Sequence, residues 1–318
     1  MSPHKVLVTG GAGFIGGHVA AALDDAGHEV VVLDSYAAGG RLPPGLHGRV
    51  TVIEGDVRDA GLVRRAAEGC ATIVHLAAVV GVEEVIRRPL DMLETETVGT
   101  QNVVDAALEH SVGKILFASS SAVYDKATDG PSRETDRLHP KSSYAVAKQL
   151  NEHLMDAVAR ETDVATNSLR FFNVYGERQD CRMVIPRFFR AAMDGAPLEV
   201  FGDGSETRDY THVSDVARAV RALVDRRHLS GAYNVARGIE TDILTLAEAI
   251  RAVTGAEAPV LLRPFPAERH SFQVHRRVGD NEKLFRDTGV RPTVLLAEGL
   301  ASYYRYRQRE LAVGVAAV

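Results

Sequence analysis

A tyrosine and a lysine four positions apart, Tyr144 and Lys148, are the residues of this sequence whose types and spacing best suit acid–base chemistry. The surrounding segment predicts a helix, and residues four apart on a helix project from one face. A phenol has an unperturbed pKa of about 10, so it acts as a base near neutral pH only when a nearby cation stabilises the phenolate. Because Lys148 supplies that cation, the pair could accept a proton from a substrate hydroxyl.

A cluster of serines precedes this pair and follows a predicted strand. Ser120 and Ser121 belong to the sequence SSSAVY, directly after the apolar run Lys114–Ala118. A serine at the end of that strand could hydrogen-bond the same hydroxyl and align it for proton transfer. The expected catalytic residues are therefore Ser120, Ser121, Tyr144 and Lys148.

Three glycines near the start of the chain, Gly10, Gly13 and Gly16, follow a predicted strand and open a predicted helix. Such glycines let the backbone approach a pyrophosphate, whose charge then lies at the positive end of the helix. The spacing Gly-x-x-Gly-x-x-Gly differs from the commoner Gly-x-Gly-x-x-Gly, so the flanking strand and helix carry most of the argument. Phe14 and Ile15 complete the expected phosphate site.

Residues at the ends of the following strands predict how the rest of a dinucleotide is bound. Asp34 ends the second predicted strand, where a carboxylate can accept both ribose hydroxyls of an adenosine and repel a 2′-phosphate; this favours NAD over NADP. Asp56, followed by Val57, could meet the adenine amino group or could be an ordinary turn residue. His75 has no partner at metal-ligand spacing, so we expect no metal site. The residues of HLAA expected along the cofactor are Leu76, Ala77 and Ala78.

The order of predicted elements indicates an α/β fold with a Rossmann-type, doubly wound parallel sheet. Short β-branched runs alternate with helical patterns, as in βαβ units covered by helices on both faces. We expect residues 1–173 to form the NAD-binding domain and residues 174–318 mainly a smaller substrate-binding lobe, with segments near 205–240 returning to the first domain. The expected strands are Lys5–Thr9, Glu29–Asp34, Val50–Ile53, Thr72–Leu76 and Lys114–Ala118, and the expected helices are Phe14–Ala26, Gly61–Glu68, Asp91–His110 and Tyr144–Arg160.

The composition points away from several other classes of protein. The chain has 318 residues and a formal net charge of −5, so neither nucleic acid nor an anionic membrane is an expected partner. The two cysteines, Cys70 and Cys181, cannot form a disulfide framework. No apolar run approaches the length of a membrane span or the core of a signal sequence. We therefore expect a cytoplasmic protein.

In combination, these motifs resemble the extended short-chain dehydrogenase/reductases of the nucleotide-sugar epimerase/dehydratase group. The likeness runs nearly from end to end, through TGGAGFIG, HLAA, SSSAVY, YAVAK, RFFNVYG, GDGSETRDY and GDNEKL. It implies NAD held permanently and a nucleoside-diphosphate (NDP) sugar bound between the two lobes. It also implies that Tyr144 is the base and Lys148 its activator. The serine that orients the sugar hydroxyl is Ser120 or Ser121, with the distance to the following VY dipeptide favouring Ser120.

The resemblance further implies residues that bind the sugar nucleotide. Asn173 in FNVYG and Arg208 in ETRDY match positions that contact the diphosphate, and arginine can hold phosphate oxygens in bidentate fashion. Arg277 matches a position where uronate decarboxylases carry an arginine that meets the sugar carboxylate; the alternative is a solvated arginine in a basic run. The other expected substrate-binding residues are Ser120, Ser121, Tyr144, Arg182, Val184 and Arg269.

Departures from the group's pattern point to the reaction. Dehydratases and uronate decarboxylases of this group carry a carboxylate two residues before the tyrosine of the VY dipeptide, where this chain has Ala122. Alanine cannot perform the acid–base step that elimination of water requires, and Asp34 disfavours an NADPH-dependent reductase. Two further departures are Glu96, in place of the usual Asn of NVxGT, and Asp125, in place of Gly after VY.

We therefore interpret the chain as an NAD-dependent 4-epimerase of an NDP-sugar, expected to be a UDP-sugar, with a UDP-hexuronate as one candidate. Its chemistry would be transient oxidation at C4 followed by return of the hydride. The alternatives are a UDP-glucuronate decarboxylase or an NDP-sugar dehydratase of the same family and, in another class, a non-catalytic NAD-binding sensor. Members of the group often pair two helices from each subunit, so we expect a homodimer through Asp91–His110 and Tyr144–Arg160.

Overall fold

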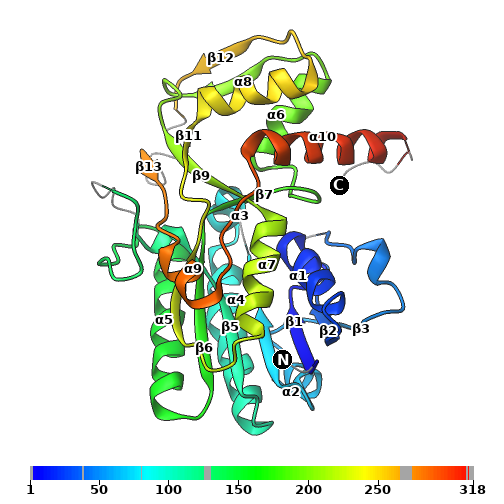
Figure 1. The fold of residues 1–318 in the computed structure, drawn as a ribbon, viewed down its shortest axis with the longest axis vertical. Coiled ribbons are helices and arrows are strands. Elements are labelled where there is room, and N and C mark those ends of the chain that lie inside the picture. Colours follow the sequence, from blue (N-terminus) through cyan, green and yellow to red (C-terminus); the bar gives the residue numbers. More distant parts are fainter. Residues whose placement is uncertain are drawn as a thin grey trace.

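The structure is a computed structural model that describes residues 3–312, except residues 38, 80, 125–129 and 266–273, and also residue 314. Its largest sheet has seven strands, all parallel, in the order β10-β6-β5-β4-β1-β2-β3 (Figure 1). The order reverses between β1 and β4, which is where α/β sheets bind ligands at the carboxyl ends of their strands. The strands are β1 (Lys5–Thr9), β2 (Glu29–Asp34), β3 (Thr51–Glu54), β4 (Thr72–His75), β5 (Lys114–Ser120), β6 (Ala165–Phe171) and β10 (Gly231–Val235).

Helices cover both faces of this sheet, because alternate side chains of each strand point to opposite faces. Val6 and Val8 of β1 lie in one core cluster, with residues of α1 (Phe14–Asp24) and α7 (Val213–Val224). Leu7, between them, lies in a second cluster on the other face. The helices of that second face are α2 (Ala60–Ala67), α4 (Pro89–Glu109) and α5 (Ser143–Glu161). The doubly wound Rossmann-type fold expected from the sequence is confirmed.

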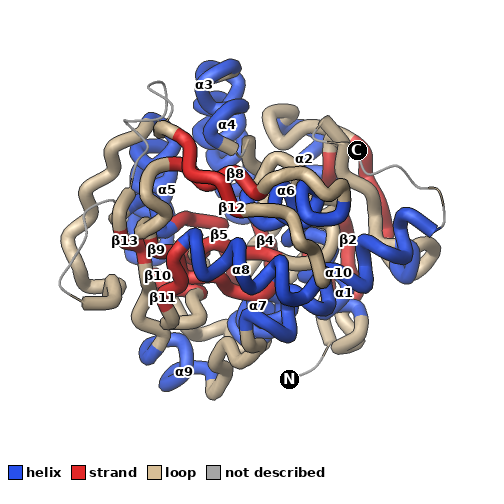
Figure 2. Tube along the Cα trace, turned by 90° about the horizontal axis from the view of Figure 1, so that it is seen from above, coloured by secondary structure: helices blue, strands red, loops and turns tan. Residues whose placement is uncertain are grey.

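A smaller group of elements lies beyond the carboxyl ends of the sheet strands (Figures 1 and 2). It has its own core, in which aromatic residues such as Phe189 and Tyr303 pack together. Its strands are β7 (Asn173–Tyr175), β8 (Leu198–Phe201), β9 (Thr207–His212), β11 (Glu240–Asp242), β12 (Val260–Arg263) and β13 (Arg276–Arg277), and its helices are α6 (Val184–Met193), α8 (Ile243–Thr254) and α10 (Leu296–Ala312).

Segments near 205–240 divide between the two groups. The α7 helix packs against α1, and β10 pairs with β6 in the large sheet, whereas β9 pairs with β7, β11 and β13 in the smaller one. We propose that residues 1–173, α7 and β10 form the cofactor-binding domain, and that most of the remainder forms the substrate-binding lobe. The connecting elements α3 (Val82–Arg87) and α9 (Glu282–Thr288) are short.

The bounds of several elements differ from the expected ones by one or a few residues. The fourth helix begins two residues early because Pro89 occupies its first turn, where proline is favoured. The helix of the Tyr-x-x-x-Lys pair begins at Ser143, since the Ser142 side chain caps it by accepting a hydrogen bond from the amide of Ala145 at 3.2 Å. The fifth strand is longer than expected and extends through Ser120, which brings the serine cluster to the edge of the sheet.

Candidate active site

Helix α5 places Tyr144 in its first turn and Lys148 one turn later. The Lys148 side chain is buried, with 2% of its surface exposed. Its Nζ atom lies 4.8 Å from the ring centroid of Phe117 and 5.6 Å from the ring centroid of Tyr144. The helix therefore brings the lysine cation beside the phenol, as the spacing of the two residues predicts.

The environment of Tyr144 shifts the pKa of its phenol in both directions. Burial is the largest influence and raises the pKa, and the charge of Glu96 raises it further. The cation of Lys148, the hydroxyl of Ser120 and the charge of Arg277 lower it. The net effect is a pKa above the ordinary value of a tyrosine. Additional positive charge near the phenol would therefore favour its action as a base.

The two candidate serines lie in different surroundings. Ser120 ends β5, is half-buried, and accepts a hydrogen bond from the amide of Ala122 at 3.2 Å. It is also the serine whose hydroxyl interacts with the Tyr144 phenol. Ser121 begins the short 3₁₀ helix that follows and is only 3% exposed. These positions favour Ser120 as the residue that orients a substrate hydroxyl.

Two glycines of the turn after β1, Gly10 and Gly16, lie where a Cβ atom would clash with the backbone. Gly10 has a φ of +68°, and a Cβ atom there would lie 2.8 Å from the amide nitrogen of Ala77. A Cβ atom on Gly16 would lie 2.0 Å from the carbonyl oxygen of Gly10. Gly13 caps α1 without a side-chain hydrogen bond, so the amides of the first turn, from Phe14 and Ile15 onward, are available to a phosphate. The turn fits a dinucleotide pyrophosphate.

Asp34 and Asp56 have different partners at the ends of neighbouring strands. Asp34 accepts hydrogen bonds from the amide of Ala12 at 2.9 Å and from the amide of Tyr36 at 2.8 Å, so its carboxylate lies against the glycine turn. Asp56 forms an ion pair with Arg58 at 2.7 Å, and this hydrogen bond lowers the pKa of its carboxyl. The adenine contact of Asp56 stays a prediction.

The other residues expected along the cofactor lie nearby in the chain. Val57 is buried, and Leu76, Ala77 and Ala78 follow β4.

The expected diphosphate and sugar residues lie on the strands of the smaller sheet. Asn173 begins β7, opposite Tyr210 of β9. Arg208 of β9 lies beside Arg277 of β13 in the strand register. Arg208 donates to the Thr207 and Val274 carbonyls and pairs with Glu206 at 3.0 Å. Arg277 is half-buried, and its charge acts on the phenol of Tyr144. Through Arg277, a charge of the smaller lobe therefore acts on the predicted catalytic tyrosine.

Two other expected substrate residues, Arg182 and Val184, lie between β7 and the first turn of α6. Arg182 forms ion pairs with Asp180 and, at 2.8 Å, with Glu84. Val184 is the first residue of α6 and packs against the core of the smaller lobe. Arg269 lies outside the residues that the structure describes. The substrate roles of all three stay predictions.

A buried polar network under the site was not found from the sequence. Arg170 of β6 donates to both carboxylate oxygens of Glu152, at 2.7 Å for the shortest contact, and to the hydroxyl of Tyr124 at 2.7 Å. Ser119 donates to Glu152, and Tyr124 donates to the Asn234 side chain at 2.7 Å. The network holds β5, β6, β10 and α5 in register and so fixes Ser120 relative to Tyr144. Arg170, a charged residue inside a strand that is buried along most of its length, is the signal that could have revealed it.

A second residue that the sequence did not reveal supports the glycine turn. Arg178 has a φ of +69°, and its guanidinium donates to the carbonyl of Ala12 at 3.2 Å. The same guanidinium lies so close to Gly17 that a Cβ atom there would be 2.2 Å from Nη1. Its burial lowers the pKa of Arg178 from the ordinary value of an arginine. Arg178 thus connects the loop after β7 to the cofactor-binding turn.

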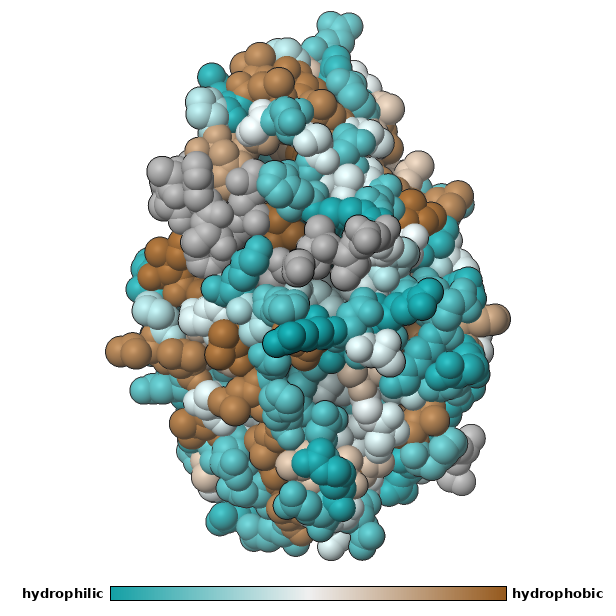
Figure 3. Space-filling view, turned by 90° about the vertical axis from the view of Figure 1, so that its left-hand side faces the viewer, coloured by the Kyte–Doolittle hydropathy of each residue, from teal (hydrophilic) through white to brown (hydrophobic). Residues whose placement is uncertain are grey.

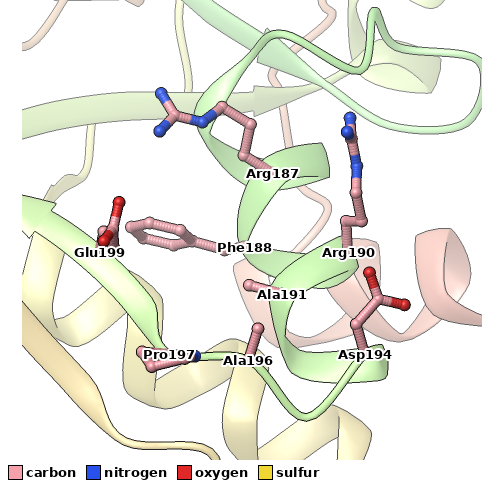
Figure 4. Close-up of a pocket in the computed structure, with 8 residues that line it drawn as sticks. All are labelled: Arg187, Phe188, Arg190, Ala191, Asp194, Ala196, Pro197 and Glu199. Atoms are coloured by element: carbon pink, nitrogen blue, oxygen red, sulfur yellow. The ribbon is translucent and has the colours of Figure 1, made fainter.

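An open pocket in the smaller lobe lies between α6 and the start of β8 (Figure 4). The ring of Phe188 points toward Glu199, and the guanidinium groups of Arg187 and Arg190 stand on one side of the pocket. Arg187 also lies over the ring of Phe201, 5.8 Å from its centroid. None of the predicted site residues lines this pocket, so it is separate from the catalytic group.

A family model described as the NAD dependent epimerase/dehydratase family matches residues 6–236. The chain belongs to this family. The match covers the glycine turn, the serine cluster, the Tyr-x-x-x-Lys pair and both lobes as far as β10. The protein is therefore an enzyme of the extended short-chain dehydrogenase/reductase type that uses NAD as its cofactor.

Individual relatives have related but different activities. The chain is 34% identical to a UDP-N-acetyl-α-D-glucosaminuronate decarboxylase from Bacillus cytotoxicus, over 93% of this chain and 95% of the relative. A dTDP-glucose 4,6-dehydratase from Actinoplanes sp. is 31% identical, over 95% of this chain and 98% of the relative.

Two solved structures show the same fold over nearly the whole chain. The UDP-glucose 4-epimerase of Thermotoga maritima, solved with UDP-glucose, has a TM-score of 0.90 and 29% identity, and covers 96% of this chain and 99% of its own. The protein MoeE5, solved with UDP-glucuronic acid and NAD, has a TM-score of 0.87 and 31% identity, with the same coverage.

None of the helices among the described residues is long and apolar enough to cross a membrane. Over the same residues, no group of three or more His, Cys, Asp or Glu side chains could hold a metal ion.

Proposed function

We propose that this enzyme is an NAD-dependent 4-epimerase of a nucleotide sugar, with a UDP-hexuronate as its preferred substrate. The observation that carries this proposal is the convergence of Ser120, Tyr144 and Lys148 at the edge of the sheet beside the glycine turn, with Ala122 next to Ser120. Ala122 offers no carboxylate for the elimination of water. Reversible oxidation at C4 needs, besides NAD as hydride acceptor, only a base and groups that orient and activate it, and Ser120, Tyr144 and Lys148 would supply these.

The side chains of this site have separate roles in the proposed reaction. Ser120 hydrogen-bonds the C4 hydroxyl of the sugar and aligns it with the phenol of Tyr144. Tyr144, as phenolate, accepts the hydroxyl proton, and later returns it to the same oxygen when the C4 centre is rebuilt with the opposite configuration. Lys148 stabilises the phenolate through its positive charge. NAD, when bound, supplies the hydride acceptor and donor for C4, with its pyrophosphate on Gly10, Gly13 and Gly16 and its ribose at Asp34.

The preference for a uronate rests on Arg277. Its charge acts on the Tyr144 phenol, and we propose that its guanidinium faces C6 of the sugar. A carboxylate at C6 would form charge-assisted hydrogen bonds with it that a hydroxymethyl group cannot replace. Similarity to a hexuronate decarboxylase and to a protein solved with UDP-glucuronic acid supports this substrate class.

The main alternative is a uronate decarboxylase, and a dehydratase is less compatible with Ala122. In a decarboxylase, the 4-keto uronate would lose carbon dioxide before the hydride returns, and a pentose would be formed. A non-catalytic sensor is disfavoured because the base, its activating lysine and the serine are all present.

A panel of sugars tests the reaction directly. The purified protein is incubated with UDP-, dTDP-, GDP- and ADP-sugars, including the hexuronates, and the products are separated. We expect the 4-epimer of a UDP-hexuronate to exceed the pentose. Pentose as the main product would identify a decarboxylase, and a 4-keto-6-deoxy sugar would identify a dehydratase.

We also propose a homodimer formed through α4 and α5. Apolar side chains stand exposed on both helices: Val98 (44%), Leu108 (45%), Val146 (52%) and Leu150 (55%). Figure 3 faces the side of the molecule on which α5 lies and shows apolar patches between the polar ones. Covering such residues in a symmetric interface would remove apolar surface from water.

A charge placed in this surface tests the dimer. Leu150→Glu should yield a monomer by light scattering at micromolar concentration, because the two-fold axis would bring like charges together. Leu311→Glu is the matched control, since Leu311 is also 55% exposed but lies on α10. Wild-type protein that is already monomeric would contradict the proposal.

A further inference from the structure

A buried carboxylate on α4, that of Glu96, contacts the catalytic lysine. Its Oε2 atom lies 2.9 Å from Lys148 Nζ, and the side chains are 1% and 2% exposed. The contact joins the two packed helices α4 and α5. Glu96 is also the residue that departs from the asparagine usual in the NVxGT pattern. The residue thus makes a contact that an asparagine, with its shorter and neutral side chain, would not make in the same way.

Among the described residues, Lys148 is the polar partner of the Glu96 carboxylate. The carbonyl oxygen of Glu96 accepts hydrogen bonds from Thr100 and, at 2.8 Å, from Asn151 of α5, which fix the backbone. Among the described residues, neither carboxylate oxygen has a hydrogen-bond partner besides the ion-pair contact. A buried ion pair gives little net stability after its desolvation. Stability alone therefore gives no reason for a carboxylate at this position.

The charged groups around the pair come from several elements. Lys148 is faced by Glu96 of α4 and by Tyr144 and Glu152 of its own helix. His75 of β4 also lies near, but burial lowers its pKa to about 3, so it is neutral at working pH. Glu152 is already paired with Arg170 at 2.7 Å.

Tyr144 is faced by Lys148, Glu96, Ser120 and Arg277. Glu96 acts on both Lys148 and Tyr144.

We propose that Glu96 is a positioning residue for catalysis. Its carboxylate, on α4, holds the ammonium group of Lys148 in place and offsets part of the effect that the lysine's positive charge has on the Tyr144 phenol. The inference rests on the roles proposed above for Tyr144 and Lys148. An anion near the phenol opposes formation of the phenolate, and the lysine cation favours it. The residue at position 96 thus sets how strongly Lys148 activates the base.

Replacement of the carboxylate by its neutral isostere, Glu96→Gln, tests this role without any substrate. The phenolate absorbance of the purified, NAD-containing protein is titrated with pH, and the titration of Tyr144→Phe is subtracted to isolate Tyr144. Loss of the negative charge should lower the midpoint of Tyr144 by about one pH unit, the lower end of what a neighbouring charge does. The acidic limb of the pH–rate profile should move by the same amount, with little change in KM.

Two sets of variants make the result specific. Glu94→Gln removes the same charge from the same helix, but Glu94 is 60% exposed and pairs with Arg58 at 3.3 Å. The titration midpoint of Tyr144 in this variant should therefore equal that of wild type. If Glu96→Gln does not fold, as judged by thermal unfolding, Glu96→Asn and Glu96→Asp replace it. The Asn variant should shift the midpoint and the Asp variant should retain most of the wild-type value.

The outcomes separate this inference from the proposed reaction. An unchanged or raised midpoint in Glu96→Gln or Glu96→Asn overturns the role of Glu96, whatever sugar the enzyme uses. A lowered midpoint supports it. If the midpoint falls but no sugar in the panel is epimerised, Glu96 has the proposed role and the proposed reaction is wrong.

Discussion

The large sheet carries polar residues at both its carboxyl edge, where the parallel strands end, and its amino edge, where they begin, and these residues have different roles. At the carboxyl edge, β1 is followed by the glycine turn and β5 ends in Ser120, beside Tyr144. At the amino edge, β5 begins with Lys114, which is fully buried and donates to the carbonyls of Arg226 at 2.8 Å and Leu229 at 3.1 Å. A polar side chain therefore stands at each end of β5, Lys114 at its start and Ser120 at its end.

The difference between the edges lies in what the polar groups face. Lys114 donates hydrogen bonds to two backbone carbonyls, which provide its buried ammonium group with acceptors. Ser120 and Tyr144 lie instead where the strand order reverses and where the smaller lobe brings Arg277. A polar residue at a strand end indicates function only at the edge where several elements converge.

The largest effect is expected for Tyr144→Phe at the carboxyl edge. The variant removes the proton acceptor and keeps the ring, so turnover should fall by about 10²–10⁴-fold, the usual contribution of a general base. Bound NAD and the midpoint of thermal unfolding should stay near the wild-type values. Near-normal epimerisation by this variant would show that another group takes the proton.

Arg277→Ala should have the next largest effect and should depend on the substrate. Truncating one partner of a buried, hydrogen-bonded charge pair costs about 2–5 kcal/mol, so kcat/KM on the hexuronate should fall by about 30-fold or more. The matching neutral hexose should be affected far less. Equal losses on both sugars would place Arg277 on the diphosphate or in solvent.

The neighbouring residue provides a control for that experiment. Arg276 carries the same charge one position earlier on β13 but pairs with Glu240 and donates to the carbonyl of Gly130. Arg276→Ala should therefore change the ratio of activities on hexuronate and hexose little.

Gly16→Ala tests the backbone part of the same edge. The added Cβ atom would lie 2.0 Å from the carbonyl oxygen of Gly10, against backbone that has little room to move. We expect a loss of stability of about 1–3 kcal/mol, as for other overpacked sites, and protein that purifies with less NAD. Gly45→Ala is the control, because nothing lies within 4 Å of a Cβ atom at that surface position. Equal NAD contents in the two variants would contradict the assignment of the turn.

The sequence was sufficient for the parts of this molecule that depend on local pattern. Continuous β-branched runs such as Glu29–Asp34 give strands buried on both faces, and their alternation with helices determines the doubly wound sheet. The glycine turn was also predictable, since its geometry depends on residues that lie next to one another in the chain.

Contacts between distant segments were not predictable from one sequence. Glu96 and Lys148 meet only because α4 and α5 pack together, and a single sequence does not reveal which buried acid meets which base. The two-residue strand Arg276–Arg277 is too short for any periodicity and forms by pairing with β9. The contacts that sequence reasoning missed, such as those of Glu96 with Lys148 and of Arg170 with Glu152, are of this long-range kind.

The smallest expected effect concerns Lys114 at the amino edge and appears in stability rather than activity. Burial, with a smaller contribution from Arg227, lowers the pKa of Lys114 to about 7 in the folded protein, whereas an unfolded lysine has a pKa of about 10.4. Between these values the unfolded chain binds more protons than the folded one, so this residue makes the free energy of unfolding rise with pH from about 7 to 10. The slope from one proton is at most about 1.4 kcal/mol per pH unit.

Replacement by an unbranched apolar side chain isolates this contribution. Urea unfolding of Lys114→Met and of wild type is compared at several pH values between 7 and 10, and the difference between them removes the other titrating groups. The variant should show the shallower dependence, while the pH profile of catalysis, which is set at the opposite end of β5, should not move. Parallel stability curves would mean that Lys114 stays protonated in the folded protein, held by the carbonyls of Arg226 and Leu229. A shifted catalytic profile would instead mean that the two edges of the sheet are coupled through β5.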